Sequence, residues 1–326
     1  YTRSIVGSGQ MCIRDSPNYY QIAKCYRDED SRKDRQPEFT QLDLEFSDAS
    51  PELVKSKVEE IVKFVFSDAY DCKIKTPFNT LTYEEAINFY GTDKPDLRIE
   101  EKIFDITDIF TDTSINFLND ILSSQGSVKA LHTKELLTRK QIDDLDTEIK
   151  ELGSNGLGWF KIEDTNISGP LAKLLNDNEK SKLLSYGSGT LLFQAGIIKE
   201  IANFLDVIRR TVFQPLNNDV YSFVWIEDFP FFEVEDGELQ PSHHPFTSPK
   251  SNEIFKDDPT NATALHYDLV LNGVELGSGS QRINNPEIQT LVLEKWGLSK
   301  EEISERFGWF IDCLLYTSPS PRDGLL

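Results

Sequence analysis

Two charged side chains at the start of a charged run are the first candidates for chemistry. In the stretch CYRDEDSRKDRQPEFTQLD (residues 25–43), Arg27 and Glu29 are two positions apart, so on an extended strand they lie on the same side. An arginine there can hold a phosphate with a planar fork of donors, which a lysine cannot reproduce. A solvated charged loop is the alternative, because runs of charge usually face water. Polar residues on the following segment, Gln41 and Asp43, favour a site.

Two acids near the end of the sequence form a second candidate. Asp268 and Glu275 occur in YDLVLNGVELGSGSQR, with the tight-turn dipeptide Asn272-Gly273 between them. A hairpin at that turn can bring both carboxylates together, as Mg²⁺ bound to substrate phosphates requires. Ordinary polar residues of a hairpin are the alternative. At this point the residues leave a magnesium site and a plain hairpin both open.

Glycines and a basic residue follow these acids. The run GSGS (residues 277–280) permits a ligand to approach the backbone closely, and Arg282 comes next. No third glycine and no helix follow at the spacing of a dinucleotide fingerprint, and GSG at residues 187–189 fails the same test. We therefore expect no dinucleotide-binding motif at either place.

Adjacent histidines, His243 and His244, are candidates for ligands, bases or packed side chains in the segment HHPFTSP. Neighbouring residues of an extended segment point to opposite sides, so we expect at most one of them to face a site. The chain has four histidines, and the sequence offers no Ser-His-Asp triad.

The elements expected to position these residues are antiparallel strands and amphipathic helices. YYQIAKCY (residues 19–26) and FTQLDLEF (residues 39–46) predict an antiparallel hairpin with a long loop. One face of its second strand is expected to be core: Thr40, Leu42, Leu44 and Phe46. Ser50-Pro51 opens a helix to about residue 70. Apolar residues are predicted on its buried side: Leu53, Val54, Val58, Ile61, Val62 and Val65. A second helix, residues 83–90, is expected to stop at Gly91.

The middle of the chain differs from its flanks. Residues 104–216 alternate predicted helices and strands, which fits a small α+β domain inserted into a larger one. Strand patterns return after residue 217, and SKEEISERFGWFID predicts a final helix. The fold class is therefore α+β, with residues 17–103 and 217–312 as the two parts of the larger domain.

Composition limits the class of protein and of partner. The chain has 326 residues, of which 38% are hydrophobic and 27% charged, and its four cysteines lack zinc-ligand spacing. A formal net charge of −21 opposes bulk binding of DNA, although a few arginines can still make a local phosphate site. No stretch has the roughly 18 apolar residues of a membrane span, and no signal pattern opens the chain. We expect a cytoplasmic protein without a membrane partner.

The two ends of the chain differ from the segments beside them. MCIRDS (residues 11–16) and CLLYTS (residues 313–318) can be encoded by opposite strands of one DNA element, which resembles a transposase adapter used in sequencing-library preparation. We therefore expect residues 1–16 and 313–326 to be adapter-derived, non-native segments that flank a natural fragment.

Several segments resemble class II aminoacyl-tRNA synthetases. YQIAKCYRDEDSRKDRQPEFTQLDLE is similar to the second signature motif of that family, in the form carried by aspartyl-tRNA synthetases. YGTDKPDLR, VWIEDFPFFE, HHPFTSP and YDLVLNGVELGSGSQRI resemble further stretches of these enzymes in the same order. Residues 104–216 resemble the inserted domain of the bacterial type. The resemblance implies a class II antiparallel sheet flanked by helices, and a homodimer.

The resemblance also implies a reaction and its substrates. L-aspartate and ATP would form aspartyl-adenylate, and the aspartyl group would then pass to the 3′ end of tRNA(Asp), and in some members also tRNA(Asn). Arg27 matches the motif arginine on the α-phosphate and the aspartate carboxylate, which would stabilise charge in the transition state. Glu29 and Gln36 match ATP contacts. Asp268 and Glu275 match the acids that hold Mg²⁺ on the phosphates of ATP.

Recognition of aspartate is implied for a second set of positions. Arg282 matches the arginine that pairs with the side-chain carboxylate of the substrate, a pairing that would select aspartate over asparagine. His243 matches an aspartate contact, and Asp43 matches a position near the substrate ammonium group. Arg27, Glu275 and Arg282 are the residues expected to be catalytic.

Some family features are altered or lie outside the sequence. Ser278 stands where a second glycine is usual, and Asn284 departs from the usual RIH. The anticodon-binding barrel, the first and third motifs and a substrate-gating loop are absent from the sequence, so we expect the chain as written to be inactive. Two alternatives are a tRNA-independent amide ligase and a non-catalytic paralogue that binds RNA or protein. The intact Arg27, Glu275 and Arg282 favour the enzyme.

Overall fold

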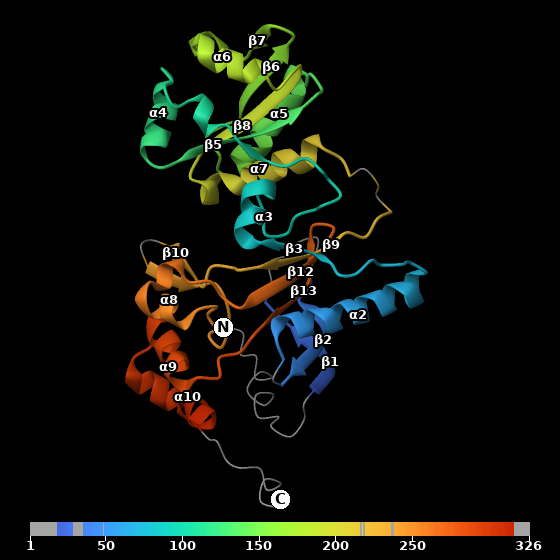
Figure 1. The fold of residues 1–326 in the computed structure, drawn as a ribbon, viewed down its shortest axis with the longest axis vertical. Coiled ribbons are helices and arrows are strands. Elements are labelled where there is room, and N and C mark those ends of the chain that lie inside the picture. Colours follow the sequence, from blue (N-terminus) through green and yellow to red (C-terminus); the bar gives the residue numbers. More distant parts are fainter. Residues whose placement is uncertain are drawn as a thin grey trace, which may run out of the picture. The chain divides into compact units, whose positions relative to one another are not determined.

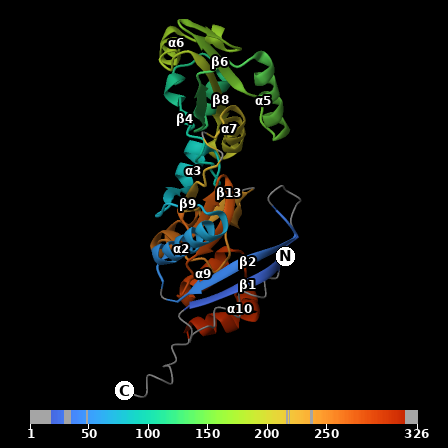
Figure 2. The same ribbon diagram turned by 90° about the vertical axis from the view of Figure 1, so that its right-hand side faces the viewer.

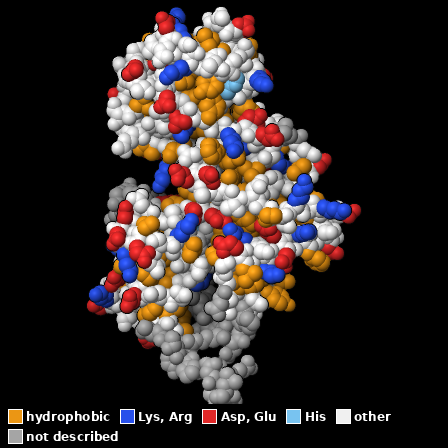
Figure 3. Space-filling model, in the orientation of Figure 1, with side chains coloured by type: hydrophobic (Ala, Val, Ile, Leu, Met, Phe, Trp, Pro, Cys, Tyr) orange, Lys and Arg blue, Asp and Glu red, His pale blue; other side chains and the backbone are white. Residues whose placement is uncertain are grey.

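The computed structural model describes residues 18–28, 35–47, 49–215, 217, 219–235 and 238–315. Two compact units divide the chain, residues 1–78 and residues 79–326, and each is described by itself. No helix among the described residues is both long and apolar enough to cross a membrane. Figure 3 shows acidic and basic side chains interspersed over the face that it draws.

An antiparallel hairpin begins the first unit. Strands β1 (Asn18–Tyr26) and β2 (Glu38–Phe46) lie side by side, as Figure 2 shows, and their register pairs Gln21 with Asp43 and Cys25 with Phe39. The alternation of polar and apolar residues predicted this pairing, and the structure confirms it.

The covered face of the hairpin is the opposite of the predicted one. Leu42 is 48% exposed, and on the same face Tyr20 is 72% and Ile22 is 76% exposed. A two-stranded sheet buries a face only where another element packs on it, and no described part of the first unit covers this one. The prediction that this face is core is therefore wrong for Thr40 and Leu42, whereas Leu44 and Phe46 are half-buried.

Helix α2 (Pro51–Tyr70) follows the hairpin. The side chain of Ser50 accepts a hydrogen bond from the backbone N–H of Leu53 and Pro51 occupies the first turn, so the predicted start is confirmed. Val62 is buried as predicted, but Leu53 is 49% and Val65 is 44% exposed, which corrects the predicted buried side. The buried face is therefore narrower than the apolar pattern indicated.

A four-stranded sheet forms the first part of the second unit (Figure 1). Its order is β13-β12-β9-β3, with bounds β3 Asn79–Thr82, β9 Phe223–Glu227, β12 His266–Leu271 and β13 Val274–Ser280. Strand β12 is antiparallel to both neighbours, while β3 runs parallel to β9. Because β12 is flanked on both sides, its backbone is held firmly in place.

Helix α3 (Tyr83–Tyr90) begins with a capping box between Thr82 and Glu85 and ends at Gly91, as predicted. Gly91 has a φ of 78°, and a Cβ there would lie 2.4 Å from the carbonyl oxygen of Ala202 on helix α7 (Ile198–Val212). Only glycine satisfies both requirements. Gly91 thus allows α3 to pack closely on α7.

Between α3 and β9 the chain forms a five-stranded sheet with helices packed around it (Figure 1). The order is β4-β5-β8-β6-β7, with bounds β4 Phe104–Asp105, β5 Ser127–Thr133, β6 Gly158–Glu163, β7 Asn166–Ser168 and β8 Gly189–Gly196. The helices are α4 Asn116–Ser123, α5 Arg139–Glu151, α6 Asp177–Leu184 and α7 Ile198–Val212. Separate buried clusters pack around this sheet. Whether residues 104–216 are an inserted domain stays a prediction.

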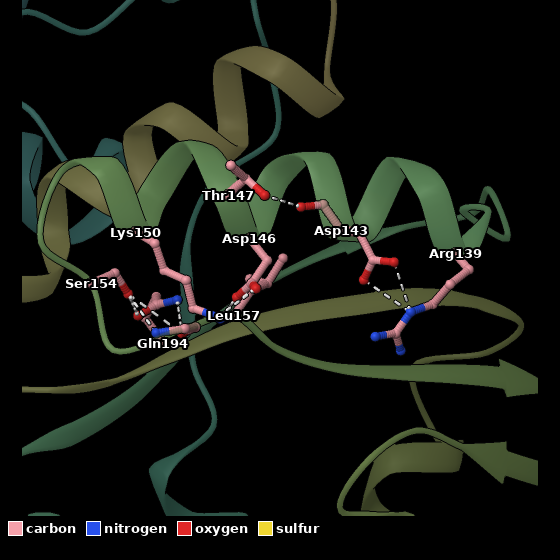
Figure 4. Close-up of polar contacts among 9 residues, drawn as sticks. Arg139, Asp143, Asp146, Thr147, Lys150, Ser154, Leu157 and Gln194 are labelled. Carbon is pink, nitrogen blue, oxygen red and sulfur yellow. Dashed lines mark hydrogen bonds and ion pairs between the residues drawn. The ribbon is translucent and has the colours of Figure 1, made fainter.

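Polar contacts tie α5 to this sheet (Figure 4). Asp146 accepts a hydrogen bond from the backbone N–H of Leu157 (2.7 Å) and pairs with the ammonium group of Lys150 (2.7 Å). The hydroxyl of Ser154 donates to the amide oxygen of Gln194 on β8 at 3.2 Å. The end of α5 is therefore anchored through side chains as well as through its apolar face.

Aromatic residues fill the core beside the four-stranded sheet. Phe231, Phe232 and Phe255 contact one another and the start of α9. The remaining elements are β10 Phe232–Glu235, β11 Glu238–Pro241, α8 Asn252–Asp257, α9 Pro286–Lys295 and α10 Lys300–Leu315. The predicted final helix is confirmed as α10.

Candidate active site

Strand β12 carries a histidine and an acid on one face. His266 and Asp268 are two positions apart, and Nε2 of His266 lies 2.9 Å from Oδ1 of Asp268. Their side chains are only 17% and 9% exposed. An ionised carboxylate can only accept, so Nε2 of His266 is the donor. His266 was not among the sequence-based candidates, although period two in HYDLVL places it beside Asp268.

A second imidazole stacks on this pair. The ring of His243 lies 4.1 Å from that of His266, centroid to centroid, with 25° between the planes. The ring of Phe229 meets both imidazoles edge-on. Burial, followed by the neighbouring His266, lowers the pKa of His243 to about 4. The ring is therefore neutral at pH 7, and within the part of the chain that the structure describes its buried Nε2 has no hydrogen-bond partner.

The segment HHPFTSP pairs with the chain around Arg282. The N–H of Ser248 donates to the carbonyl of Gln281 (2.8 Å), and the N–H of Ile283 donates to the carbonyl of Phe246 (2.9 Å). This pairing sets His244 near Arg282, and desolvation of the ring together with that positive charge lowers the pKa of His244 to about 4. His243 and His244 thus have different neighbours.

The hairpin between β12 and β13 sets the places of the two predicted metal ligands. Glu275 lies opposite Val270, and Ser278 lies opposite Asp268. Directly opposed residues share a face, so Glu275 and Asp268 are diagonal neighbours on one face rather than a facing pair. Asn272 and Gly273 have φ of 52° and 84°, as the predicted tight turn requires.

The two glycines of β13 differ in their surroundings. A Cβ on Gly277 would meet no atom within 4 Å, whereas one on Gly279 would lie 2.5 Å from the ring of Tyr267. The space beside Gly277 is open, and the close approach of a ligand to its backbone stays a prediction. Gly279 instead makes room for an aromatic ring of the protein.

A lysine from the segment after α3 reaches Glu275. Nζ of Lys94 lies 3.4 Å from Oε2 of Glu275. Asp96 holds that segment through an ion pair with Arg98 at 2.7 Å. The buried Arg209 of α7 donates to the backbone carbonyls of Asp96 and Glu101. Sequence reasoning did not assign Lys94, because its contact with Glu275 joins positions far apart in the chain.

The first unit holds the remaining predicted site residues. The guanidinium of Arg27 lies 5.0 Å from the centre of the Phe39 ring, and its backbone N–H donates to the carbonyl of Pro37 (2.9 Å). Oδ2 of Asp43 accepts a hydrogen bond from Nε2 of Gln21 at 3.2 Å. Gln36 is exposed just before β2, and Glu29 lies outside the described residues.

Similarity to known proteins decides the family. The family model of tRNA synthetases class II (D, K and N) matches residues 9–324. The chain belongs to this family. The mainly antiparallel sheets flanked by helices agree with its α+β fold.

Relatives of this class II synthetase chain share a name. An aspartate–tRNA(Asp/Asn) ligase of Hydrogenobaculum sp. (strain Y04AAS1) is 38% identical over 97% of this chain and 57% of its own length. An aspartate–tRNA ligase of Mycoplasma mycoides is 40% identical over 95% of this chain and 55% of its own length. An aspartate–tRNA(Asp/Asn) ligase of Dictyoglomus turgidum is 40% identical, with 94% and 54% covered. The chain therefore spans a little over half the length of these relatives.

A magnesium ion held by Asp268 and Glu275 stays a prediction, although both side chains offer the oxygen ligands that Mg²⁺ prefers. Among the described residues no group of three or more His, Cys, Asp or Glu side chains could hold a metal ion alone. Mg²⁺ usually keeps several waters and takes one or two carboxylates plus phosphates, and Asp268 and Glu275 share one face of the hairpin. The grouping of these residues with Arg27, Gln36 and Asp43 stays a prediction.

Proposed function

We propose that this chain is the catalytic part of an aspartate–tRNA ligase. It would activate L-aspartate with ATP and pass the aspartyl group to the 3′ end of tRNA(Asp), or also of tRNA(Asn). The names of relatives that are 38–40% identical support aspartate as the substrate. We further propose a homodimer in the cytoplasm for the full-length protein.

One arrangement carries the choice of aspartate. The cation of Arg282 lies beside His244, which is neutral at pH 7. A carboxylate ligand would find one positive charge and a neutral imidazole there. An amide side chain would gain no ionic pairing, so this surrounding favours aspartate over asparagine.

Activation needs no nucleophile from the protein. A carboxylate oxygen of aspartate attacks the α-phosphorus of ATP, a bond from oxygen to phosphorus forms, and the bond to pyrophosphate breaks. Arg27 would hold the α-phosphate and stabilise the charge that grows there. Alignment of the two substrates then supplies much of the rate. When bound, Mg²⁺ on Asp268 and Glu275 would neutralise charge on the phosphates of ATP.

Transfer would follow at the same site. A ribose hydroxyl at the 3′ end of tRNA attacks the carbonyl carbon of the adenylate and an ester bond forms. AMP leaves with the electron pair of the broken bond, and a phosphate oxygen of the leaving AMP takes the hydroxyl proton. The net charge of −21 gives no bulk attraction to tRNA, so local arginines would have to hold the substrate phosphates.

Binding of a stable reaction-intermediate analogue tests this proposal on the chain itself. Aspartyl-sulfamoyl-adenosine should bind in calorimetry at least about tenfold more tightly than the asparaginyl compound, the least that loss of one ionic pairing implies. Equal affinities for the two compounds would remove the proposed substrate.

A further inference from the structure

His266 contacts both a predicted metal ligand, Asp268, and a predicted aspartate contact, His243. Its Nε2 contacts Oδ1 of Asp268 at 2.9 Å, and its ring face lies 4.1 Å from the ring of His243. Its side chain is only 17% exposed, so His266 is not a surface residue. None of the roles described so far uses it.

We propose that His266 is a positioning residue that fixes the carboxylate of Asp268 through its Nε2 donor and fixes the ring of His243 through its stacked face. The proposal rests on the proposed function, in which Asp268 serves the metal and His243 serves aspartate. It goes further because one residue, His266, would orient both Asp268 and His243.

The first contact limits how Asp268 can turn. The backbone of Asp268 is held by Ile226 on one side and Ser278 on the other, so only the side-chain torsions remain free. A hydrogen bond to Oδ1 restricts those torsions and leaves Oδ2 for an ion. Carboxylates that bind metals are commonly oriented in this way, and loss of the orienting partner typically costs about 10- to 100-fold in metal affinity.

The second contact limits how His243 can turn. His243 belongs to a segment outside the regular strands, so its ring depends on neighbouring side chains for its orientation. The face of His266 and the edge of Phe229, whose centroid lies 5.5 Å away at 88°, hold the ring from two directions. This fixed orientation determines where the buried Nε2 of His243 points.

Simple space filling is the alternative role, since His266 also touches Phe229 at the edge of an apolar cluster. Two substitutions separate the roles. His266→Gln keeps a nitrogen donor of similar reach but loses the ring, and His266→Phe keeps a ring but loses the donor. A space-filling residue would affect metal and ligand binding in parallel with the loss of stability.

The test measures three properties of this chain and its variants. Mn²⁺ in the presence of ATP is followed by electron paramagnetic resonance, and aspartyl-sulfamoyl-adenosine by calorimetry. The ring protons of the histidines are followed by NMR, in which the four histidines allow individual assignment. The matched control is His132→Gln on β5, far along the chain from the site, and each variant is checked by thermal unfolding.

The two variants should differ in the property that they lose: metal affinity in His266→Phe and the orientation of the His243 ring in His266→Gln. His266→Phe should weaken Mn²⁺–ATP binding about 10- to 100-fold and leave the His243 ring signals close to their wild-type shifts. His266→Gln should keep Mn²⁺–ATP affinity within about threefold, shift the His243 signals through loss of the ring current and weaken binding of the analogue. His132→Gln should change none of these.

Two results would overturn the inference, and they differ from failure of the proposed function. If His243 signals do not move in ligand-free His266→Gln, the stacked support does not exist, whatever the chain binds. If the wild-type chain binds both probes but the variants lose them equally, His266 only fills space. If neither the wild-type chain nor the protein extended to the length of its relatives binds either probe, the proposed function and the inference that rests on it are both wrong.

Discussion

His243 and His244 are adjacent residues whose charge depends on different neighbours. Burial makes the largest contribution to lowering the pKa of each histidine to about 4. The second contribution comes from His266 for His243 and from Arg282 for His244. Both rings are therefore neutral at pH 7, which leaves Arg282 as the positive charge beside His244. The proposed selectivity for aspartate therefore depends on the positive charge of a single residue, Arg282.

Removing the charge of Arg282 should raise the pKa of His244. In Arg282→Gln the imidazolium no longer meets a like charge, while desolvation still opposes protonation, so the pKa should rise from about 4 only part of the way towards 6.5. An NMR titration of the histidine ring protons measures it, and His132 provides the unaffected reference. A His244 pKa that stays at its wild-type value would show that the two groups do not interact.

The same shifts predict how stability depends on pH. In the folded chain the pKa of His244 is about 4, and in the unfolded chain it is about 6.5. As the pH falls below about 6.5, the unfolded chain therefore takes up a proton at His244 before the folded chain does. The free energy of unfolding should therefore decrease between pH 6.5 and pH 4. Replacing His244 with glutamine should make the urea-unfolding free energy less dependent on pH in that window, and an unchanged slope would contradict the assigned shift.

At the scale of elements, the local features of the fold follow from local sequence. Ser50-Pro51 starts α2, Gly91 ends α3, and Asn272-Gly273 turns between β12 and β13, because caps and tight turns require particular residues. Burial was less predictable from the pattern. The hairpin face containing Leu42 alternates as a core face would, but burial depends on what packs there, and the alternation does not say.

Two glycines with similar backbones should respond differently to a methyl group. Gly91 and Gly187 have φ of 78° and 81°, but a Cβ at Gly91 would lie 2.4 Å from a carbonyl oxygen, and one at Gly187 would meet nothing within 4 Å. Gly187→Ala should cost about 1 kcal/mol from backbone strain alone, and Gly91→Ala about 3 kcal/mol or more. Urea unfolding compares them, and equal losses would contradict the close packing of α3 on α7.

The exposed hairpin face makes a further prediction for this chain. Leu42 is 48% exposed, so Leu42→Thr should change the free energy of unfolding by less than about 1 kcal/mol, whereas loss of a buried leucine costs about 2–5 kcal/mol. Threonine keeps the preference for a strand. Urea unfolding measures the change, and a loss of 2 kcal/mol or more would mean that the face is covered after all.

At the scale of the whole molecule, contacts between distant segments complete the site in the second unit. His266 with His243, Lys94 with Glu275, and Arg282 with His244 each join parts of the chain that sequence spacing alone does not connect. Motif resemblance indicated Asp268, Glu275, His243 and Arg282, whereas the supporting contacts of His266 and Lys94 required the fold. The chain spans 54–57% of the length of these relatives.

Activation of aspartate is measured as aspartate-dependent exchange of pyrophosphate into ATP, in the protein extended to the length of its relatives. We expect exchange with L-aspartate and not with L-asparagine, and a loss of at least about tenfold, equal to about 1.4 kcal/mol, in Arg282→Ala. Absence of aspartate-dependent exchange, or equal exchange with both amino acids, would contradict the account.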